Sequence, residues 1–159
     1  MVAAHPSVGQ VWQWLGEIPD PEVPALSIVD LGIVRDVQWT DNQNELVVSI
    51  TPTYSGCPAM EVIANDIRSS LNEHGVERLN LRTQLSPPWT TDWLSDDAKE
   101  RLRAYGIAPP PLISITTSIS CPHCGSDEIQ LVSRFGSTPC KAIYKCLSCL
   151  EPFDAFKRH

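Results

Sequence analysis

Two Cys-x-x-Cys pairs restrict the fold of this chain more than any other sequence feature. The four cysteines are Cys121, Cys124, Cys146 and Cys149. Because two intervening residues make a tight turn, both thiolates of a pair can face one point, and two pairs supply the four ligands of a tetrahedral zinc site. Strand-like runs at 129–135 and 142–145 lie between the pairs. The spacing therefore predicts a β zinc ribbon.

Four thiolates leave no open coordination position, so we expect Zn²⁺ to be a structural cofactor in this ribbon. Its binding free energy would become folding free energy, which is about 10–16 kcal/mol for structural zinc in small peptides. The same spacing is compatible with two disulfides, with unligated thiols and with a rubredoxin-like iron site. Iron or an iron–sulfur cluster therefore stays open as the alternative cofactor.

The charge distribution argues against a nucleic-acid partner. The 159 residues carry a net charge of −7, and residues 1–111 hold 7 basic against 15 acidic side chains. A nucleic-acid-binding protein needs a basic face to neutralise phosphates. No apolar run is long enough for a membrane span, and no signal peptide is recognisable. Together with six cysteines, four of them in metal spacing, these features predict a cytoplasmic protein without a membrane partner.

The residues before the ribbon predict a small α+β domain. Apolar residues recur with helical spacing after Ser7, a plausible helix cap, and again after Pro58. The expected elements, in chain order, are a helix at 8–15, a short helical turn at 27–32, a hairpin of strands 33–39 and 46–51, a helix at 58–73, a strand at 79–85 and a helix at 96–105. We expect a domain at 1–106, a proline-rich linker at 107–112 and the ribbon at 113–159.

One cysteine of this domain stands at the expected start of a helix. Cys57 precedes Pro58, which suits the first helical position. A thiol there meets unpaired N–H groups and the positive end of the helix dipole, which favour the thiolate. Cys57 is therefore a candidate nucleophile or metal ligand, although a lone cysteine is more often a small core residue. Asp20 and Glu22 lie in a loop stiffened by two prolines, and residue type alone favours solvated carboxylates.

Three short motifs of the first part of the chain form a recognisable set. They are Asp20-Pro21-Glu22, Asp30-Leu31-Gly32 followed by Ile33-Val34, and Thr51 followed by Gly56-Cys57-Pro58. Over about residues 5–90 they resemble the signature of the small domain found in iron–sulfur assembly factors, including SufT-like proteins. Longer strings occur at residues 51–58, 87–93, 105–110 and 121–125. These strings resemble one branch, the PaaD family of bacterial phenylacetate degradation, over essentially the whole chain.

The resemblance implies an accessory protein of the multicomponent system that epoxidises the ring of phenylacetyl-CoA, and not an enzyme by itself. Its partners would be protein clients in that system, either the iron–sulfur reductase or the diiron oxygenase, together with iron–sulfur assembly factors. By position, Cys57 matches the family's reactive cysteine, and Asp20 and Glu22 match its acidic loop. A thiolate with a nearby carboxylate suits a weak, exchangeable site for metal or cluster transfer. The sequence leaves open whether the chain forms a homodimer.

Cys140 is the sixth cysteine and lies outside both pairs, beside Lys141. It is either an unligated extra thiol or a competing ligand that would let the ribbon hold an iron–sulfur cluster. Two other functions also remain open for the whole chain. The first is a thiol-redox enzyme with Cys57 as nucleophile, although no histidine adjoins that cysteine in the sequence. The second is a structural adaptor in which Cys57 is buried and the ribbon holds partner proteins.

Overall fold

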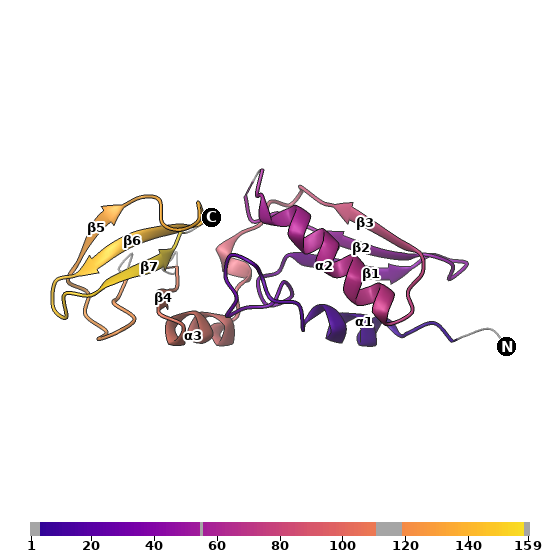
Figure 1. Ribbon diagram of the computed structural model, residues 1–159, viewed down its shortest axis with the longest axis horizontal. Helices are drawn as coiled ribbons and strands as arrows, with labels where there is room; N and C mark the ends of the chain where they lie inside the picture. The colour runs from indigo at the N-terminus through magenta and orange to yellow at the C-terminus, as the bar shows by residue number, and fades with distance from the viewer. Residues whose placement is uncertain (1–3, 55, 111–118, 158–159) are drawn as a thin grey trace. The chain divides into compact units, whose positions relative to one another are not determined.

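The computed structural model describes residues 4–54, 56–110 and 119–157 (Figure 1). Contacts group the chain into two units, Met1–Trp89 and Thr90–His159. Helices and strands are mixed within the chain, and this confirms the α+β class predicted from the sequence. Within the described ranges, no helix is both long enough and apolar enough to cross a bilayer.

The first unit is built around a three-stranded sheet. Its elements are α1 (Val8–Leu15), β1 (Val34–Trp39), β2 (Leu46–Ile50), α2 (Ala59–Glu73) and β3 (Leu79–Thr83). The strand order is β1-β2-β3, with β1 antiparallel and β3 parallel to β2. A parallel neighbour requires a crossover connection, and α2 provides it. Figure 1 shows α2 lying along the sheet.

The helices form where the sequence places apolar residues at helical spacing. Ile63, Ile67 and Leu71 recur every fourth residue along α2 and are completely buried. Each such side chain contributes about 1.5–3 kcal/mol when it leaves water. The predicted cap of α1 is confirmed, because the Gln10 N–H donates to Ser7 Oγ at 3.2 Å while Gln10 Oε1 accepts from the Ser7 N–H at 2.9 Å.

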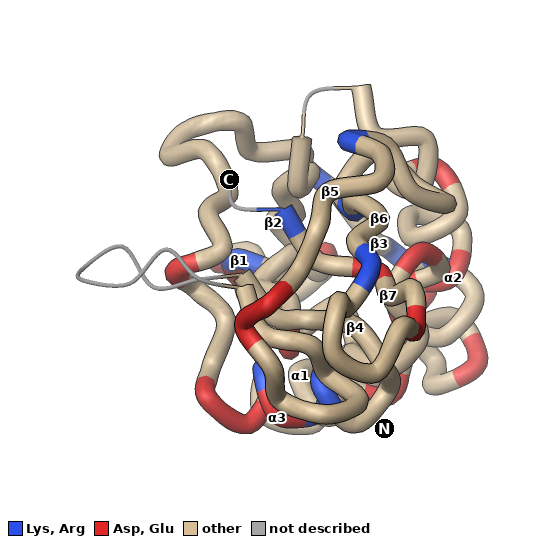
Figure 2. Tube along the Cα trace, turned by 90° about the vertical axis from the view of Figure 1, so that its left-hand side faces the viewer, with Lys and Arg blue, Asp and Glu red and all other residues tan. Residues whose placement is uncertain are grey.

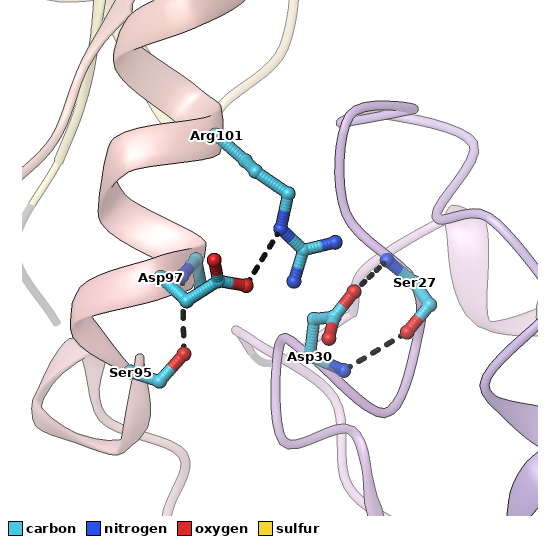
Figure 3. Close-up of polar contacts among 6 residues, drawn as sticks. Ser27, Asp30, Ser95, Asp97 and Arg101 are labelled. Atoms are coloured by element: carbon cyan, nitrogen blue, oxygen red, sulfur yellow. Dashed lines mark hydrogen bonds and ion pairs between the residues drawn. The ribbon is translucent and has the colours of Figure 1, made fainter.

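The predicted helical turn at 27–32 is a single hydrogen-bonded turn between α1 and β1. The Leu31 N–H donates to the Ser27 carbonyl at 3.1 Å. Ser27 and Asp30 also exchange two bonds, in which Ser27 N–H donates to Asp30 Oδ2 at 2.9 Å and Asp30 N–H donates to Ser27 Oγ at 3.0 Å (Figure 3). Gly32 ends the turn with φ of 74°, a conformation that glycine adopts without a Cβ clash.

The second unit contains the ribbon. Its elements are a 3₁₀ turn η1 (Thr91–Trp93), α3 (Asp96–Ala104), β4 (Ile107–Ala108), β5 (Ile129–Ser133), β6 (Lys141–Cys146) and β7 (Pro152–Phe156). The sheet order is β4-β7-β6-β5. The two predicted ribbon strands correspond to β5 and β6, whereas β4 and β7 were not predicted. At the start of α3, Ser95 Oγ accepts from the Ala98 N–H, and Asp97 pairs with Arg101 at 3.1 Å (Figure 3).

Strand β4 lies within the stretch that the sequence predicted as a linker. Ile107 pairs with Asp154 and Ala108 pairs with Ala155 of β7, so these two residues belong to the ribbon sheet. Residues 109–110 of the predicted linker are described and belong to no helix or strand, and 111–112 lie outside the described residues. Contacts divide the chain after Trp89, and the domain boundaries expected at 1–106, 107–112 and 113–159 stay a prediction.

Candidate functional site

The four cysteines of the ribbon converge on one point. Their sulfur atoms all lie within 4.8 Å of one another. The Sγ atoms of Cys121 and Cys149 are 3.8 Å apart, and those of Cys124 and Cys146 are 3.6 Å apart. These separations are too long for disulfides, in which the sulfurs lie about 2.05 Å apart. A tetrahedral zinc site with Zn–S bonds of about 2.3 Å has sulfur–sulfur edges of about 3.8 Å. The four thiols therefore fit a tetrahedral metal ion.

Each pair forms a tight turn in which a backbone N–H group points to the sulfur of the first cysteine. The His123 N–H points to Cys121 Sγ at 3.4 Å, and the Cys149 N–H points to Cys146 Sγ at 3.4 Å. The two turns need a left-handed residue after the second cysteine, and Gly125 and Leu150 have φ of 79° and 66° there. N–H groups aimed at sulfur stabilise thiolates, which are the metal-binding form of cysteine.

The thiols of the ribbon differ in acidity. The N–H of Cys149, outweighing the effect of burial, lowers the pKa of Cys146 to about 6. The Glu151 N–H acts to lower the pKa of Cys149, but burial and the neighbouring thiols raise it to about 12. Four adjacent sulfurs resist carrying four negative charges, and a divalent cation removes that restriction because it replaces the protons. The donor set is thus suited to a soft divalent metal and leaves no open position for catalysis.

The four-cysteine cluster is part of the ribbon's hydrophobic core. Cys121 and Cys146 are 2% and 0% exposed and pack with Ala108, Phe153 and Ala155. The predicted extra thiol, Cys140, is also buried, but it lies outside the four-sulfur group. Its Sγ is 3.0 Å from Thr138 Oγ1. The role of Cys140, as an unligated extra thiol or as a competing ligand, stays a prediction.

The acidic loop of the first unit is held together by one of its own carboxylates. Asp20 is only 5% exposed, so the expectation of a solvated carboxylate is wrong for this residue. Its Oδ1 accepts from the Glu22 N–H at 2.9 Å and from the Val23 N–H at 2.8 Å. These bonds compensate for the removal of the carboxylate from water. Asp20 thus fixes the position from which Glu22 extends.

Cys57 is half-buried just before α2. The structure places Pro58 at the helix cap and Ala59 at the first helical position, one residue later than predicted. The Cys57 N–H donates to the Tyr54 carbonyl at 3.2 Å. The Tyr54 hydroxyl in turn donates to Glu22 Oε1 at 3.4 Å. Tyr54 therefore connects the loop of Cys57 to the acidic loop.

This arrangement is not a preformed metal site. Across 4–54, 56–110 and 119–157, the four ribbon cysteines are the only group of three or more potential ligand side chains close enough to share an ion. Sequence reasoning named Cys57, Asp20 and Glu22 but missed the linking role of Tyr54. The signal available was its place three residues before Cys57.

Two family models match the two parts of the chain. An iron–sulfur cluster assembly protein model matches residues 9–77, and a PaaD zinc beta ribbon domain model matches residues 112–157. Fold and thiol cluster thus define a protein that joins an iron–sulfur assembly domain to a zinc ribbon. A protein from Escherichia coli K12, provisionally named as the D component of 1,2-phenylacetyl-CoA epoxidase, is 49% identical over 97% of this chain and 94% of its own length. The chain belongs to this PaaD family, as the sequence motifs predicted.

Shorter relatives match about half of the chain. The iron–sulfur protein maturation auxiliary factor SufT from Staphylococcus aureus is 35% identical over 50% of this chain and 90% of its own length. Among solved structures, a domain of unknown function from Bacillus anthracis is 32% identical with a TM-score of 0.54, covering 60% of this chain and 90% of its own. A conserved hypothetical protein from Thermotoga maritima is 27% identical with a TM-score of 0.53, covering 64% and 98%.

Proposed function

We propose that this chain is an accessory protein of the phenylacetyl-CoA ring-epoxidase system that assists iron–sulfur cluster assembly or metal insertion into a client component. The client is the iron–sulfur reductase or the diiron oxygenase of that system. Two findings support the proposal: the relationship to an epoxidase component over nearly the whole chain, and the names of the SufT-type relatives. In this proposal the chain assists the epoxidase system and is not its catalyst, and the four-thiol cluster, which has no open position, supplies no catalytic metal.

The connection from Cys57 through Tyr54 to Glu22 is the observation that carries the proposal. A half-buried thiol at a helix start is accessible to a client and can bind iron softly. Glu22 is held near the same loop by the Tyr54 hydroxyl, and Asp20 orders the backbone beneath it. A site with one thiolate and one carboxylate binds its metal or cluster cargo weakly. Weak binding suits release to a client.

The ribbon has a different part in this proposal. Its four thiols hold one structural Zn²⁺, whose neutralising charge and four bonds replace much of the core that so short a segment lacks. The ribbon thereby offers a rigid surface to protein partners. Iron bound in the same four thiols is the alternative that metal analysis would detect.

The test measures cluster content in the client. Cells that carry the epoxidase system and Cys57→Ser in this chain should yield a purified client with less iron and acid-labile sulfide than wild type. Cys140→Ser is the matched control, because that cysteine is buried outside both sites. A fully loaded client in the Cys57→Ser cells would refute transfer through Cys57.

A structural adaptor is the second candidate. It is favoured by the lack of a preformed ligand group around Cys57 within the described residues. In that case Cys57→Ser leaves client loading unchanged, whereas disruption of the ribbon by Cys146→Ser lowers client activity. Turnover by the isolated protein that disappears in Cys57→Ser would instead indicate a thiol-dependent enzyme.

A further inference from the structure

A small cavity opens beside the loop that follows β2. Its volume is about 220 Å³, and all its described lining residues belong to the first unit. A cavity of about 150 Å³ in a protein core is large enough to hold benzene, so this one has room for a single aromatic ring with a short substituent. The described lining residues are Thr51, Pro52, Thr53, Tyr54, Leu85, Pro88 and Trp89.

The two aromatic residues of the lining use their polar ends in other contacts. The Trp89 indole N–H donates to the Leu31 carbonyl at 2.6 Å, and the Tyr54 hydroxyl donates to Glu22 Oε1 at 3.4 Å. Because these polar ends are engaged, the two side chains offer the cavity mainly carbon, and the two prolines and the leucine add more. Aromatic side chains attract another aromatic ring through stacked and edge-to-face contacts, beyond the effect of buried area.

The described lining carries no charge but includes a buried hydroxyl. None of its residues belongs to the blue and red positions of Figure 2, which mark Lys, Arg, Asp and Glu. A charged ligand group would therefore lose water without gaining a counter-charge. Thr51 is 1% exposed, and its Oγ1 has no hydrogen-bond partner among the described residues. A carbonyl oxygen on a ligand would supply that partner without bringing a charge.

From the size and the lining of this cavity we infer that it binds a small uncharged aromatic compound, a benzene ring whose short substituent carries a carbonyl oxygen. The ring packs against Trp89 and Tyr54, and the Thr51 hydroxyl donates to the carbonyl. Ligand sites are commonly apolar with a few polar groups that fix the orientation of the ligand, and this lining has that composition. Binding of the ring is separate from cargo transfer through Cys57, so either can fail without the other.

An NMR titration of the full metal-loaded chain with phenylacetamide tests this site. The chain has five tryptophans, and Trp89 is the one that belongs to the described lining. Its indole N–H signal should shift and saturate with a dissociation constant of about a millimolar or less, while the other four indole signals stay in place. Cyclohexylacetamide, which lacks the aromatic ring, should bind at least about threefold more weakly. Phenylacetate, which carries a charge, should also bind more weakly.

Substitutions in the lining locate the ligand. Leu85→Ala removes one wall of the cavity at a side chain that is 69% exposed, and it should weaken binding about threefold to tenfold. Val62→Ala is the matched control, since Val62 is 48% exposed on α2 and outside the described lining, and it should leave the affinity unchanged. Thr51→Val keeps the shape of the side chain and should weaken binding of phenylacetamide but not of benzene, which has no acceptor. A Trp89 signal that does not saturate up to about 20 mM phenylacetamide, or equal affinity of the wild type, Leu85→Ala and Thr51→Val, would overturn the inference.

Discussion

Two buried polar side chains of the first unit differ in how well the fold satisfies them. Asp20 accepts two backbone N–H groups at 2.8 and 2.9 Å, and its carboxylate is thus compensated for burial. Thr51 is 1% exposed, and its Oγ1 has no hydrogen-bond partner among the described residues. Both residues belong to the motifs shared with iron–sulfur assembly factors. Substitution at the two positions should therefore have opposite effects on stability.

Asp20→Ala should destabilise the first unit. The change removes the acceptor for two N–H groups in a buried loop, and each unpaired group costs about 1–3 kcal/mol. Urea unfolding followed by fluorescence measures the loss. Glu22→Ala is the control, because Glu22 is half-buried, its bond from the Tyr54 hydroxyl is long at 3.4 Å, and the two loop N–H groups donate to Asp20 and not to its carboxylate; it should cost less than Asp20→Ala. Equal losses would contradict the supporting role of Asp20.

Thr51→Val should leave stability unchanged or increase it by about 1 kcal/mol. Valine has nearly the shape of threonine and removes a hydroxyl that is buried without a partner in the described part of the chain. The same urea experiment measures the change. A clear loss of stability would mean that the hydroxyl has a partner in solution, such as a bound water.

At the scale of elements, local sequence patterns were enough to predict the metal ligands and the helix caps, but not the pairing of strands that are distant in the sequence. The four ribbon ligands could be predicted because each pair is defined by two intervening residues. The caps at Ser7 and Ser95 likewise depend on neighbours three residues away. Strand β7 could not be predicted because it starts with Pro152, and a proline argues against a strand when only the local sequence is read. Its pairing with β6 and β4 depends on how the whole ribbon folds.

The first unit shows the same limit. The sequence predicted the strand at 79–85, but its parallel alignment with β2 depends on the crossover through α2. The burial of Asp20 was missed because residue type alone favours exposed carboxylates. The link from Glu22 to Tyr54 joins residues separated by 32 positions. No periodic pattern of the sequence encodes such a contact.

The two cysteine turns should release their metal in acid. A metal-binding cysteine must lose its proton, so protons compete with the metal. Because the pKa of Cys146 is lowered to about 6, its thiolate persists in the metal-free turn until the pH falls through about 6. Below that pH, Cys146 also takes up a proton, so the affinity of the four thiols for the metal should fall more steeply as the pH decreases. A chromophoric chelator measures release against pH, and retention unchanged to about pH 4 would contradict this site.

At the scale of the whole molecule, the two units depend on different sources of stability. The first has helices whose buried faces cover a sheet, with Ile63, Ile67 and Leu71 fully enclosed. In the ribbon, two of the metal-binding cysteines are themselves members of the core cluster. Metal removal should therefore affect the ribbon selectively.

Chelation should unfold residues 119–157 and leave 4–54 and 56–89 protected. Without the metal, four sulfurs lose the bonds that fix both turns, and the remaining core around Phe153 and Ala155 is small. Amide hydrogen exchange by mass spectrometry, with and without chelator, measures both parts in one sample. Cys146→Ser should reproduce the effect, whereas Cys140→Ser should retain the metal because Cys140 lies outside the four-sulfur group. Protection of 119–157 that survives complete metal removal would contradict this expectation, because it would show that the ribbon's apolar contacts suffice for folding.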